Sequence, residues 1–524
     1  MSSQVKLDNI SLSHSPADPA GSAGTPSLIA YLAYVVPVAL LLYSLFSPTN
    51  LRHIPTEGAS SLPLLSYIGV RDYLRDAKGV LQRGYTKHKG KVFKVAFTDR
   101  WLVVVTGKKL VDELQRLPDD AVSFVEAAGD LSAIRYTFGE RIIQDPYHVP
   151  IIRTHLTKHL APMFSDIYDE VSAAFDELIP RTGDEWVSVH AIKVIRSIVA
   201  RASNRAFVGL PLCRNTAFLD TAIDFTVDVA KARVFLALFP EVLKPLAVKM
   251  IKSIDTRVQE CMQHLRPFID ERMRFAEELG DDWSDKPSDM LQWIIDEVKT
   301  RDSSAEEVVR MILLMNFAAI FTSSNSFTYA LYHLAASPEF AAPLREEIEA
   351  VVAEDGWTKI SMGKMWRLDS FLRESQRYNG INPVSVMRKA MKSFTLSDGT
   401  YIPKGTTLVT PALATHFDSD NYVNPTVFDP FRYVREKEQD MSAVKHQFVT
   451  TSPEYVSFGH GKHACPGRFF AANELKCMMA YVVVNYDVKL EKEGVLPKNV
   501  HTATSIAPNP EARVFFRRRK PSAA

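Results

Sequence analysis

One cysteine near the C-terminus stands in a setting that suits a metal ligand. Cys465 lies within the stretch FGHGKHACPGRFF, between two glycines and ahead of a long apolar segment. Glycine lets the backbone approach a bulky ligand without a Cβ in the way. Pro466 suits the first turn of a helix, whose N-terminal N–H groups favour a thiolate over a neutral thiol. A zinc site needs further cysteines or histidines at short spacing, so a single axial thiolate favours haem.

The same stretch resembles the haem-binding loop of the cytochromes P-450, the haem-thiolate monooxygenases, in its fungal form. Its pattern F-x-x-G-x-x-x-C-x-G starts at Phe458 and ends at Gly467. The alternative for such a pattern is a buried free cysteine beside a glycine turn. The resemblance implies that Cys465 is the axial ligand of haem b. It also places Phe458, Gly459 and Gly467 around the cofactor, with Phe458 shielding the thiolate side.

A long helical run over residues 306–335 is the second candidate for chemistry. Its section Met311–Phe321 is almost wholly apolar and is followed by hydroxyls at Thr322 and Ser323. We therefore expect a buried helix that admits a flat ligand close by, with packing of small residues between helices as the alternative. By the resemblance this is the family's distal helix, and Thr322 matches its proton-delivering threonine. Phe321 departs from the pattern because it replaces an acid, so Thr322, Ser323 and ordered water would have to relay protons.

A charged pair lies upstream of the cysteine loop. Glu374 and Arg377 are spaced to share one helix face, and Arg432 follows in the stretch FDPFR. Pairs at this spacing are usually surface features worth about 0.3 kcal/mol. The resemblance instead implies the family's buried Glu-x-x-Arg pair, with Arg432 as its third member. We expect a structural network that holds the core around the haem.

Basic residues are needed because burying the two propionates of haem requires cations. The resemblance assigns this role to His463, two positions before the cysteine, and to Arg388, in the strand-like stretch after Pro383. Arg153 is a third candidate, from the helix that flanks the haem edge. The alternative for each of them is an ordinary solvated side chain.

Substrate contacts are expected from three largely apolar segments: the loop 122–146, the distal helix near 317–321, and residues 381–387. An apolar pocket with few polar groups implies a lipophilic molecule. Two polar side chains, Asn382 and Ser385, offer hydrogen bonds. The candidate contact residues are Phe317, Ala318, Asn382, Val384 and Ser385.

Residues 234–250 form a further apolar stretch, interrupted by prolines. A buried helix–loop–helix is one interpretation. The other is an access loop that dips into the membrane surface and admits an apolar substrate. The resemblance favours the access loop, because in the family this region lies between the helices that roof the active site.

The composition argues against a protein whose main ligand is nucleic acid. The 524 residues are 46% hydrophobic and 23% charged, with a formal net charge of +1. These values are ordinary for a globular protein and give no reason to expect nucleic acid as the ligand. The four cysteines are widely spaced and form no disulfide framework, which fits a reducing compartment for the folded body.

The N-terminal part of the chain predicts a membrane anchor. Residues 28–46 contain no charge and as a helix would span about 28 Å, close to the roughly 30 Å hydrocarbon core of a bilayer. A cleaved signal peptide is the alternative. Basic residues after the run place the body in the cytosol. The predicted organisation is a disordered luminal leader (1–27), the anchor (28–46), a proline-containing linker (47–66), a haem-thiolate catalytic domain (67–519) and a tail (520–524).

Short strands at 91–96 and 101–106 precede a long region in which helical periodicity dominates. The predicted fold is therefore mainly α with a small β-containing N-terminal lobe. Together with the motifs, this indicates the cytochrome P-450 fold, preceded by one transmembrane helix.

These features predict a monooxygenase in the endoplasmic reticulum membrane that hydroxylates a lipophilic substrate with dioxygen and electrons from NADPH. The sequence shows no flavin or nicotinamide domain, so the resemblance implies a separate NADPH–cytochrome reductase, with cytochrome b5 as a further candidate donor. Runs such as LRESQR and FTLSDG are similar to enzymes of mushroom-forming fungi that act on terpenoids and steroids. We expect a triterpenoid or steroid-like substrate first and a sesquiterpenoid second.

Two alternatives stay open. A haem-thiolate enzyme that isomerises, dehydrates or cyclises without net oxygen insertion is one, and Phe321 motivates it. A non-catalytic haem-binding or sensing membrane protein is the other. The presence of Thr322 and of apolar substrate-facing loops argues against a non-catalytic role.

Overall fold

The computed structural model describes residues 51–58, 66–180, 184–237, 239, 243–301, 304–440, 443–502 and 505–520. The predicted luminal leader and transmembrane helix lie outside the described residues, as do parts of the predicted linker and tail. Residues from Leu51 onward form one structural unit.

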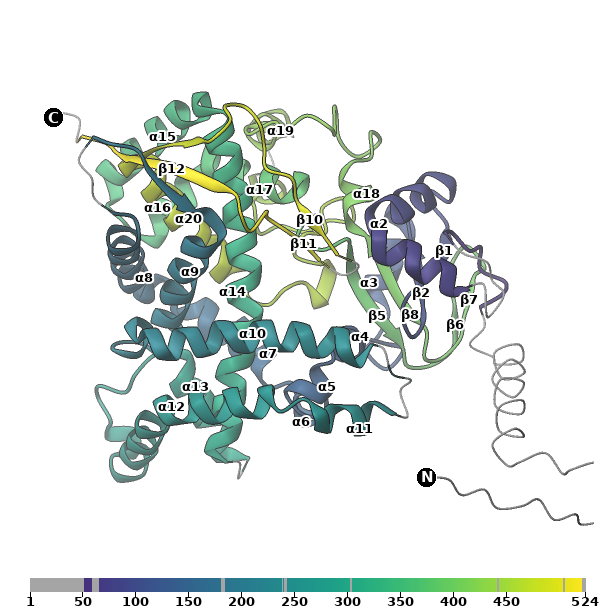
Figure 1. Ribbon diagram of the computed structural model, residues 1–524, viewed down its shortest axis with the longest axis horizontal. Helices are drawn as coiled ribbons and strands as arrows, with labels where there is room; N and C mark the ends of the chain where they lie inside the picture. The colour runs from purple at the N-terminus through teal and green to yellow at the C-terminus, as the bar shows by residue number, and fades with distance from the viewer. Residues whose placement is uncertain are drawn as a thin grey trace, which may run out of the picture. The chain divides into compact units, whose positions relative to one another are not determined.

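Long helices make up most of this unit, and α14 (Ala305–Ala336) runs through its middle (Figure 1). The helical run predicted from the sequence is confirmed as one continuous helix. Residues 311–316 and 323–335 of α14 are buried, because apolar side chains occur on every face and other helices pack around it. Its direct neighbours are α9 (Ala191–Phe207), α10 (Thr216–Leu236), α12 (Ser253–Glu278), α13 (Met290–Thr300), α17 (Trp366–Tyr378) and α20 (Arg468–Asn485).

Other helices extend this bundle or cover the sheet. Helix α8 (Thr157–Leu178) packs against α9 and α20, and α2 (Ser66–Lys87) packs against the strands β1 (Val92–Ala96) and β8 (Thr407–Pro411). The α-helices of the described residues that are not among the direct neighbours of α14 given above are α2 (Ser66–Lys87), α3 (Lys108–Arg116), α4 (Phe124–Ser132), α5 (Ile134–Thr137), α6 (Arg141–Gln144), α7 (His148–Pro150), α8 (Thr157–Leu178), α11 (Lys244–Ala247), α15 (Ala341–Asp355), α16 (Lys359–Lys364), α18 (Ala412–His416) and α19 (Arg432–Asp440). A π-helical turn, η2, covers Ile151–Leu156, and 3-10 turns are η3 (Leu212–Arg214), η5 (Val248–Met250), η6 (Gly280–Asp282), η7 (Pro338–Phe340), η8 (Ala443–His446) and η9 (Gly461–His463).

A five-stranded sheet with the order β1-β2-β8-β5-β3 forms the β-rich lobe. Its strands are β1 (Val92–Ala96), β2 (Trp101–Val105), β3 (Val122–Ser123), β5 (Val384–Ala390) and β8 (Thr407–Pro411). The two strands predicted from the sequence are confirmed as β1 and β2, which pair antiparallel. The lobe is not built from the N-terminal region alone, because β5 and β8 come from the C-terminal half of the chain. Strand β8 pairs parallel to β2, and such long-range pairing leaves no local sequence signal.

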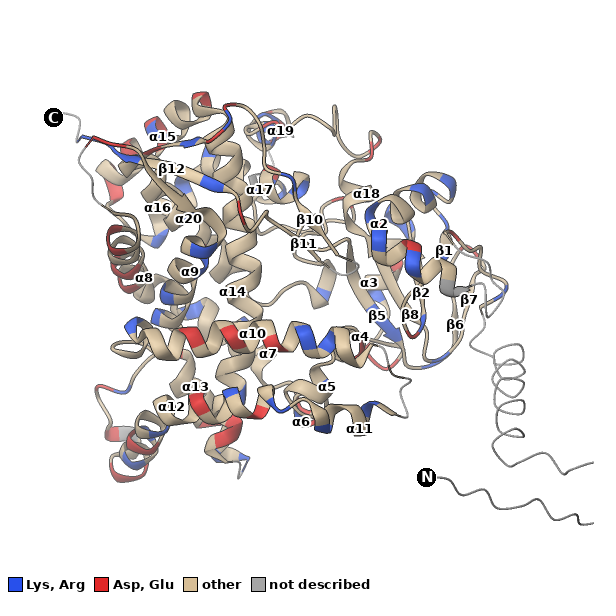
Figure 2. Ribbon diagram, viewed as in Figure 1, with Lys and Arg blue, Asp and Glu red and all other residues tan. Residues whose placement is uncertain are grey.

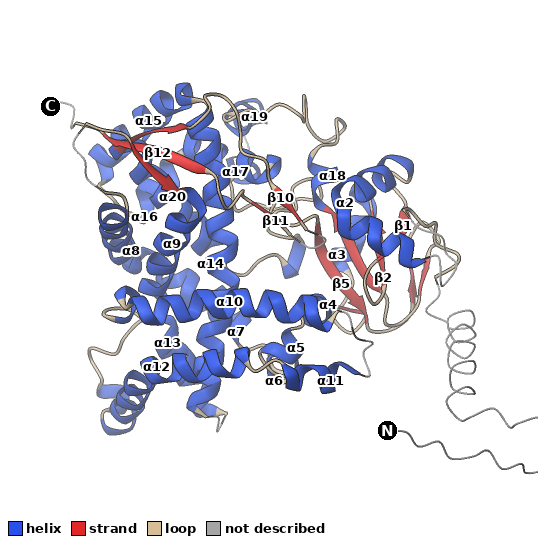
Figure 3. Ribbon diagram, in the orientation of Figure 1, coloured by secondary structure: helices blue, strands red, loops and turns tan. Residues whose placement is uncertain are grey.

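Smaller sheets lie elsewhere in the described ranges. In the three-stranded sheet β4-β12-β9, the central β12 is antiparallel to both neighbours and fastens the last described residues to the body. Figure 3 shows the five-stranded sheet at one end and β12 among helices at the other. The remaining strands are β4 (Val187–His190), β6 (Phe394–Thr395), β7 (Tyr401–Ile402), β9 (Tyr486–Leu490), β10 (Val500–His501), β11 (Ile506–Ala507) and β12 (Arg513–Arg518).

Within the described ranges, α14 is the one helix long and apolar enough to cross a membrane by length and composition. Most of its side chains are buried by surrounding helices, so in this fold it serves as the core helix.

The segment 234–250 contains the end of α10, helix α11 and the turn η5. Its described side chains are divided between core and surface, since Leu236 and Ala247 are buried in one cluster with Ala133. Four of its apolar side chains are exposed, namely Val234, Leu243, Leu246 and Met250. The segment is therefore buried in part, and its other apolar side chains lie on the surface.

Candidate active site

The middle of α14 is accessible, although the helix is buried on either side of it. Ala318 is exposed and Phe317, Phe321 and Thr322 are half-buried, whereas the adjoining turns are fully buried. Protein interiors are close-packed, so accessible side chains at the centre of a core helix border a cavity. The residues predicted for the distal helix therefore face space inside the molecule.

The hydroxyl of Thr322 is held against this accessible section. Its Oγ1 donates to the carbonyl of Ala318 at 2.8 Å, one turn earlier in the same helix. The hydroxyl oxygen keeps its acceptor lone pairs in this arrangement. Thr322 can therefore still accept a hydrogen bond from a molecule that enters the cavity.

The loop before α20 holds Cys465 with its side chain accessible. The backbone N–H of Cys465 donates to the carbonyl of Phe458 at 2.7 Å, which closes the loop. Gly459 and Gly461 have φ of 72° and 73°, in the left-handed region that favours glycine. A Cβ at Gly461 would also stand 2.0 Å from Oε1 of Gln115. Both glycines are thus required by the backbone of this loop.

The electrostatic setting of Cys465 combines burial with stabilising dipoles. Burial raises the pKa of the thiol, whereas the backbone N–H groups of Gly467 and Arg468 and the charge of Arg468 lower it. The side chain is both accessible and closely surrounded by protein, which fits a thiol that faces an internal cavity. Because Gly467 is the N-cap of α20, the start of this helix favours a thiolate ligand.

Arg388 is a buried cation with unused N–H groups. It is 1% exposed, and its Nε and Nη2 have no hydrogen-bond partner in the described structure. Its Nη1 donates to the carbonyl of Met387 at 2.8 Å. Burial lowers the pKa of the guanidinium to about 10, with Asp119 opposing the shift. A buried, unpaired guanidinium is unfavourable, so this site fits a buried anion such as a haem propionate.

An irregularity in β5 sets the direction of Arg388. The pairing of β5 with β8 shifts register between Ser385 and Arg388. At the shift, Val386 has φ of 48°, a conformation that is rare for a β-branched residue. Bulges of this kind re-aim side chains and recur beside functional sites. Ser385 Oγ donates to the carbonyl of Val456 at 2.7 Å, which ties the strand to the segment before the cysteine loop.

The other predicted cations contact protein groups at the edge of the cysteine loop. His463 Nε2 lies 2.6 Å from Asp119 Oδ1, and burial lowers the pKa of its imidazole. Arg153 donates through Nη2 to the carbonyl of Lys462 at 3.1 Å. Of the three predicted cations, Arg388 is the one for which unpartnered buried N–H groups are found in the described structure.

The predicted substrate residues lie on α14 and on or just before β5. Phe317 packs against Phe138, with ring centroids 5.4 Å apart. Val384 is half-buried and Asn382 is exposed. The hydroxyl of Ser385 is engaged with the backbone, as described above, so its role in the fold is to position β5.

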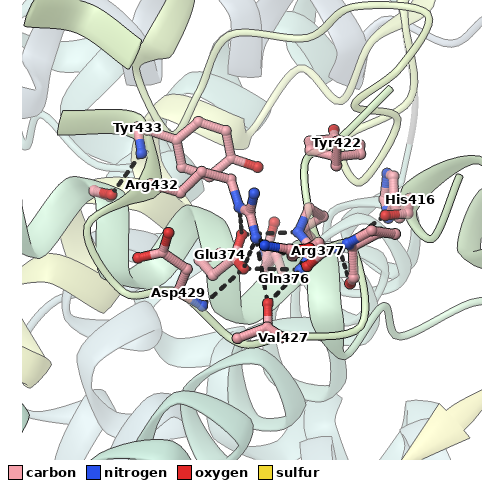
Figure 4. Close-up of polar contacts among 12 residues, drawn as sticks. Glu374, Gln376, Arg377, His416, Tyr422, Val427, Asp429, Arg432 and Tyr433 are labelled. Atoms are coloured by element: carbon pink, nitrogen blue, oxygen red, sulfur yellow. Dashed lines mark hydrogen bonds and ion pairs between the residues drawn. The ribbon is translucent and has the colours of Figure 1, made fainter. Parts of the chain in front are cut away.

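Glu374, Arg377 and Arg432 form a buried network (Figure 4). Arg377 donates through Nε and Nη2 to the two carboxylate oxygens of Glu374, each at 2.8 Å. Arg432 Nε donates to the same carboxylate at 3.2 Å. Glu374 and Arg377 are 0% exposed and Arg432 is 6% exposed. The pair is therefore not a surface feature, and Arg432 occupies the third position that the sequence predicted.

The same guanidinium groups hold the segment before α19. Arg377 Nη1 donates to the carbonyls of His416 and Pro425, both at 2.8 Å. Arg432 Nη1 donates to the carbonyl of Val423 at 2.6 Å. These bonds satisfy the remaining donors, so the network fastens α17 to the loop between α18 and α19.

Sequence interpretation missed Glu474, a buried acid in α20. Glu474 is 0% exposed and its Oε1 accepts a hydrogen bond from Ser203 Oγ at 2.6 Å, while Oε2 has no partner in the described structure. Burial raises the pKa of Glu474 to about 7, and the nearby hydroxyls of Ser203 and Ser323 oppose the shift. A signal was available, since an acid in a largely apolar helix indicates a buried polar role. Glu474 thus links α9 and α20 with α14 beside Thr322.

Glu474→Gln is expected to remove a pH dependence of stability. The pKa of Glu474 is about 7 in the fold, against 4.5 for an ordinary glutamate, so between these values the folded state keeps a proton that the unfolded state releases. The contribution of Glu474 to the free energy of unfolding should be largest below about pH 4.5, fall by roughly 3 kcal/mol as the pH rises to about 7, and then level off. Unfolding midpoints measured by circular dichroism across this range report the slope.

The matched control is Glu277→Gln, which changes an exposed glutamate of α12. It should keep the wild-type slope. If Glu474→Gln loses stability with rising pH as steeply as the wild type, Glu474 does not hold the proton.

Comparison with known proteins places this site in a family. The family model for cytochrome P-450 matches residues 58–515. The chain belongs to the cytochrome P-450 family. It is 48% identical to cytochrome P-450 monooxygenase 151 of Postia placenta over 94% of this chain and 98% of the relative. A cytochrome P-450 monooxygenase of Ganoderma lucidum is 38% identical over 92% and 95%, and the ent-kaurene oxidase P-450-4 of Gibberella fujikuroi is 29% identical over 94% and 97%.

Membership gives this P-450 its mostly helical fold, its monooxygenase activity and its cofactor, haem b with an axial cysteine thiolate. The residues present fit that cofactor. Cys465 offers an accessible thiol at the start of α20, Arg388 offers unpaired buried N–H groups, and α14 is accessible around Ala318.

Proposed function

We propose that this P-450 hydroxylates a lipophilic terpenoid, triterpenoid or steroid-like first and sesquiterpenoid second, with electrons from NADPH delivered by a separate reductase. The accessible section of α14 around Ala318 carries the proposal, because its flanking side chains Phe317 and Phe321 are apolar. An apolar cavity favours a lipophilic ligand. One relative is named as an ent-kaurene oxidase, which supports a terpenoid.

Bound haem supplies the reductive activation of dioxygen, which no side chain can perform. We assign Cys465 as the axial ligand and Phe458 as the apolar neighbour of its sulfur. Arg388 is assigned to a propionate, since it combines burial with unpartnered N–H groups. His463 and Arg153, which contact the same loop region, complete the cationic edge.

Proton delivery is assigned to the hydroxyl of Thr322 together with ordered water. Phe321 cannot relay a proton, so this hydroxyl is the nearest exchangeable group on the accessible face of α14. Ser323 follows Thr322 in the chain and is buried, and Glu474 is a buried acid whose pKa lies near 7, so we include both as candidates in the proton path.

We also propose that residues 28–46 anchor the protein in the endoplasmic reticulum membrane, with the catalytic domain in the cytosol. The exposed apolar side chains of segment 234–250 suit contact with the membrane surface. Arg153 and Lys462 are exposed beside the cysteine loop. Their positive charge suits an acidic electron donor such as NADPH–cytochrome reductase or cytochrome b5.

Turnover under oxygen-18 gas is expected to yield a product that carries one labelled oxygen atom. The full-length protein is combined with reductase, NADPH and a panel of triterpenoids, steroids and sesquiterpenoids, and products are read by mass spectrometry. A monooxygenase transfers one atom of dioxygen to substrate, so the label must appear whenever product appears. A reaction without NADPH is the control and should give no product.

Phe321 favours a second candidate, a haem-thiolate isomerase or cyclase. Isomerisation and cyclisation do not activate dioxygen, so they do not need the proton relay that a phenyl ring cannot provide. Unlabelled product in the same assay would establish this candidate and overturn hydroxylation. A non-catalytic haem protein would give no product from any substrate in the panel.

A further inference from the structure

A cavity of about 450 Å³ lies between the end of α10, the α4–α5 region and the loop after β10. Its apolar wall includes Leu74, Phe97, Leu131, Ala133, Leu236 and Ala237. Phe97 and Leu131 pack in one cluster with Val384 and Met387 of β5, the strand that carries Arg388. The cavity therefore adjoins the strand that borders the proposed haem site.

The charged side chains of this wall are paired, with one exception. The ion pairs are Lys244–Asp99 at 2.7 Å, Arg135–Glu126 at 3.1 Å and Asp130–Lys389 at 2.9 Å. The exception is the guanidinium of Arg233, for which no hydrogen bond or ion pair is found in the described structure, and burial lowers its pKa. The wall thus carries one cation that lacks an anion.

The surroundings of Arg233 differ from those of an ordinary surface arginine. A surface arginine keeps its charged head in water, and burial would then have no effect on its pKa. Arg233 is only partly exposed, and it lines a mainly apolar cavity. Lys231, two residues earlier, is exposed and pairs with Asp228 at 3.5 Å. Figure 2 shows basic residues at the end of α10 nearest α4.

An unpaired guanidinium in an apolar wall is unfavourable until an anion joins it. Its planar fork binds a carboxylate through two parallel hydrogen bonds. Among the described residues, the acids of the wall are already engaged by Lys244 and Lys389, so an anion from solution is the partner that we consider.

The position of Arg233 on α10 sets how a bound molecule lies. Phe225 of α10 contacts Phe138, with ring centroids 5.2 Å apart, and Phe138 contacts Phe317 of α14. Arg233 follows Phe225 by about 12 Å along the helix axis. That length is comparable to a fused-ring skeleton, so an apolar body that runs along α10 from Arg233 would reach the level of Phe225, which lies beside α14.

We infer that Arg233 binds the carboxylate of a lipophilic carboxylic acid and directs the apolar body of this substrate towards α14. This inference rests on the proposed function, because it names the class of the lipophilic substrate. It implies that oxidation occurs at a carbon remote from the carboxylate.

The test compares a carboxylic acid with its methyl ester in the full-length, haem-bound enzyme. Lithocholic acid and methyl lithocholate share a steroid skeleton and differ in charge. Titration of the haem absorbance in non-ionic detergent, where no lipid phosphate competes, gives each Kd. Wild type should bind the acid about tenfold more tightly than the ester. Arg233→Gln should lose this preference and keep the Kd for the ester.

Lys231→Gln is the matched control on the same helix and should keep the wild-type preference. No response to the acid, equal affinity of wild type for acid and ester, or a preference that survives in Arg233→Gln overturns the inference. Equal affinity for acid and ester, with labelled product from both compounds, would support the proposed hydroxylation and overturn the carboxylate site at Arg233. Arg233-dependent binding of the acid with no labelled product from any substrate would leave the carboxylate site standing and overturn the proposed function.

Discussion

Cys465→Ala is expected to abolish the red-shifted absorbance band of the reduced, carbon monoxide-bound enzyme, together with all turnover. Cys465 is the accessible cysteine, whereas Cys213, Cys261 and Cys477 are buried, so no other thiol can replace it. Alanine provides no donor atom, and the N–H groups of Gly467 and Arg468 would lose the sulfur that they stabilise. The measurements are the carbon monoxide difference spectrum, the haem content of the purified protein and the rate of product formation.

Cys261→Ala is the control for this experiment. Cys261 is a buried cysteine of α12, and its replacement removes a thiol without touching the loop before α20. This variant should keep the red-shifted band. An unchanged band in Cys465→Ala would refute the assignment of the axial ligand.

Glu374→Gln is expected to prevent the folded, haem-loaded enzyme from accumulating. Gln keeps the shape of Glu but removes the negative charge shared by Arg377 and Arg432, which are both buried. Removing one partner of a buried ion pair costs about 3–5 kcal/mol, which is a large part of the roughly 5–15 kcal/mol that holds a domain folded. Soluble yield, haem content and the thermal unfolding midpoint are the measurements.

The control for Glu374→Gln is an exposed pair at helical spacing. In α12, Arg266 and Asp270 lie 2.8 Å apart with both side chains more than half exposed. Asp270→Asn should leave yield and haem content unchanged, because exposed pairs contribute little. A stable Glu374→Gln variant with full haem content would show that the buried network is dispensable.

Local patterns in the sequence were sufficient for the chemistry of this protein. The residues around Cys465 are neighbours in the chain, so the thiolate, the glycine turns and the helix start appear together in one short stretch. Glu374 and Arg377 share a helix face through their spacing, and the apolar run of α14 predicts a buried helix. These features depend on backbone geometry over a few residues, which a sequence displays directly. They also predicted the family that the comparisons identified.

Tertiary structure decided what depends on contacts between distant segments. The sheet that was expected to be N-terminal takes β5 and β8 from the other half of the chain. The unpaired N–H groups of Arg388 lie on a strand of that sheet, next to a shift in its register. Pairings of this kind are fixed by the packing of whole elements, and the residues concerned carry no local pattern that distinguishes them.

Glu474 and Arg233 show the same limit for polar groups. Glu474 meets Ser203 across 271 positions of sequence, and only the packing of α9, α14 and α20 makes it a buried acid. Among the described residues, the guanidinium of Arg233 lacks a partner because the acids in its cavity are engaged by cations from other elements. The residue types in the sequence thus determined which chemistry this protein can perform. Burial and hydrogen-bond partners are properties of the assembled core, and they decided which polar groups stay available for that chemistry.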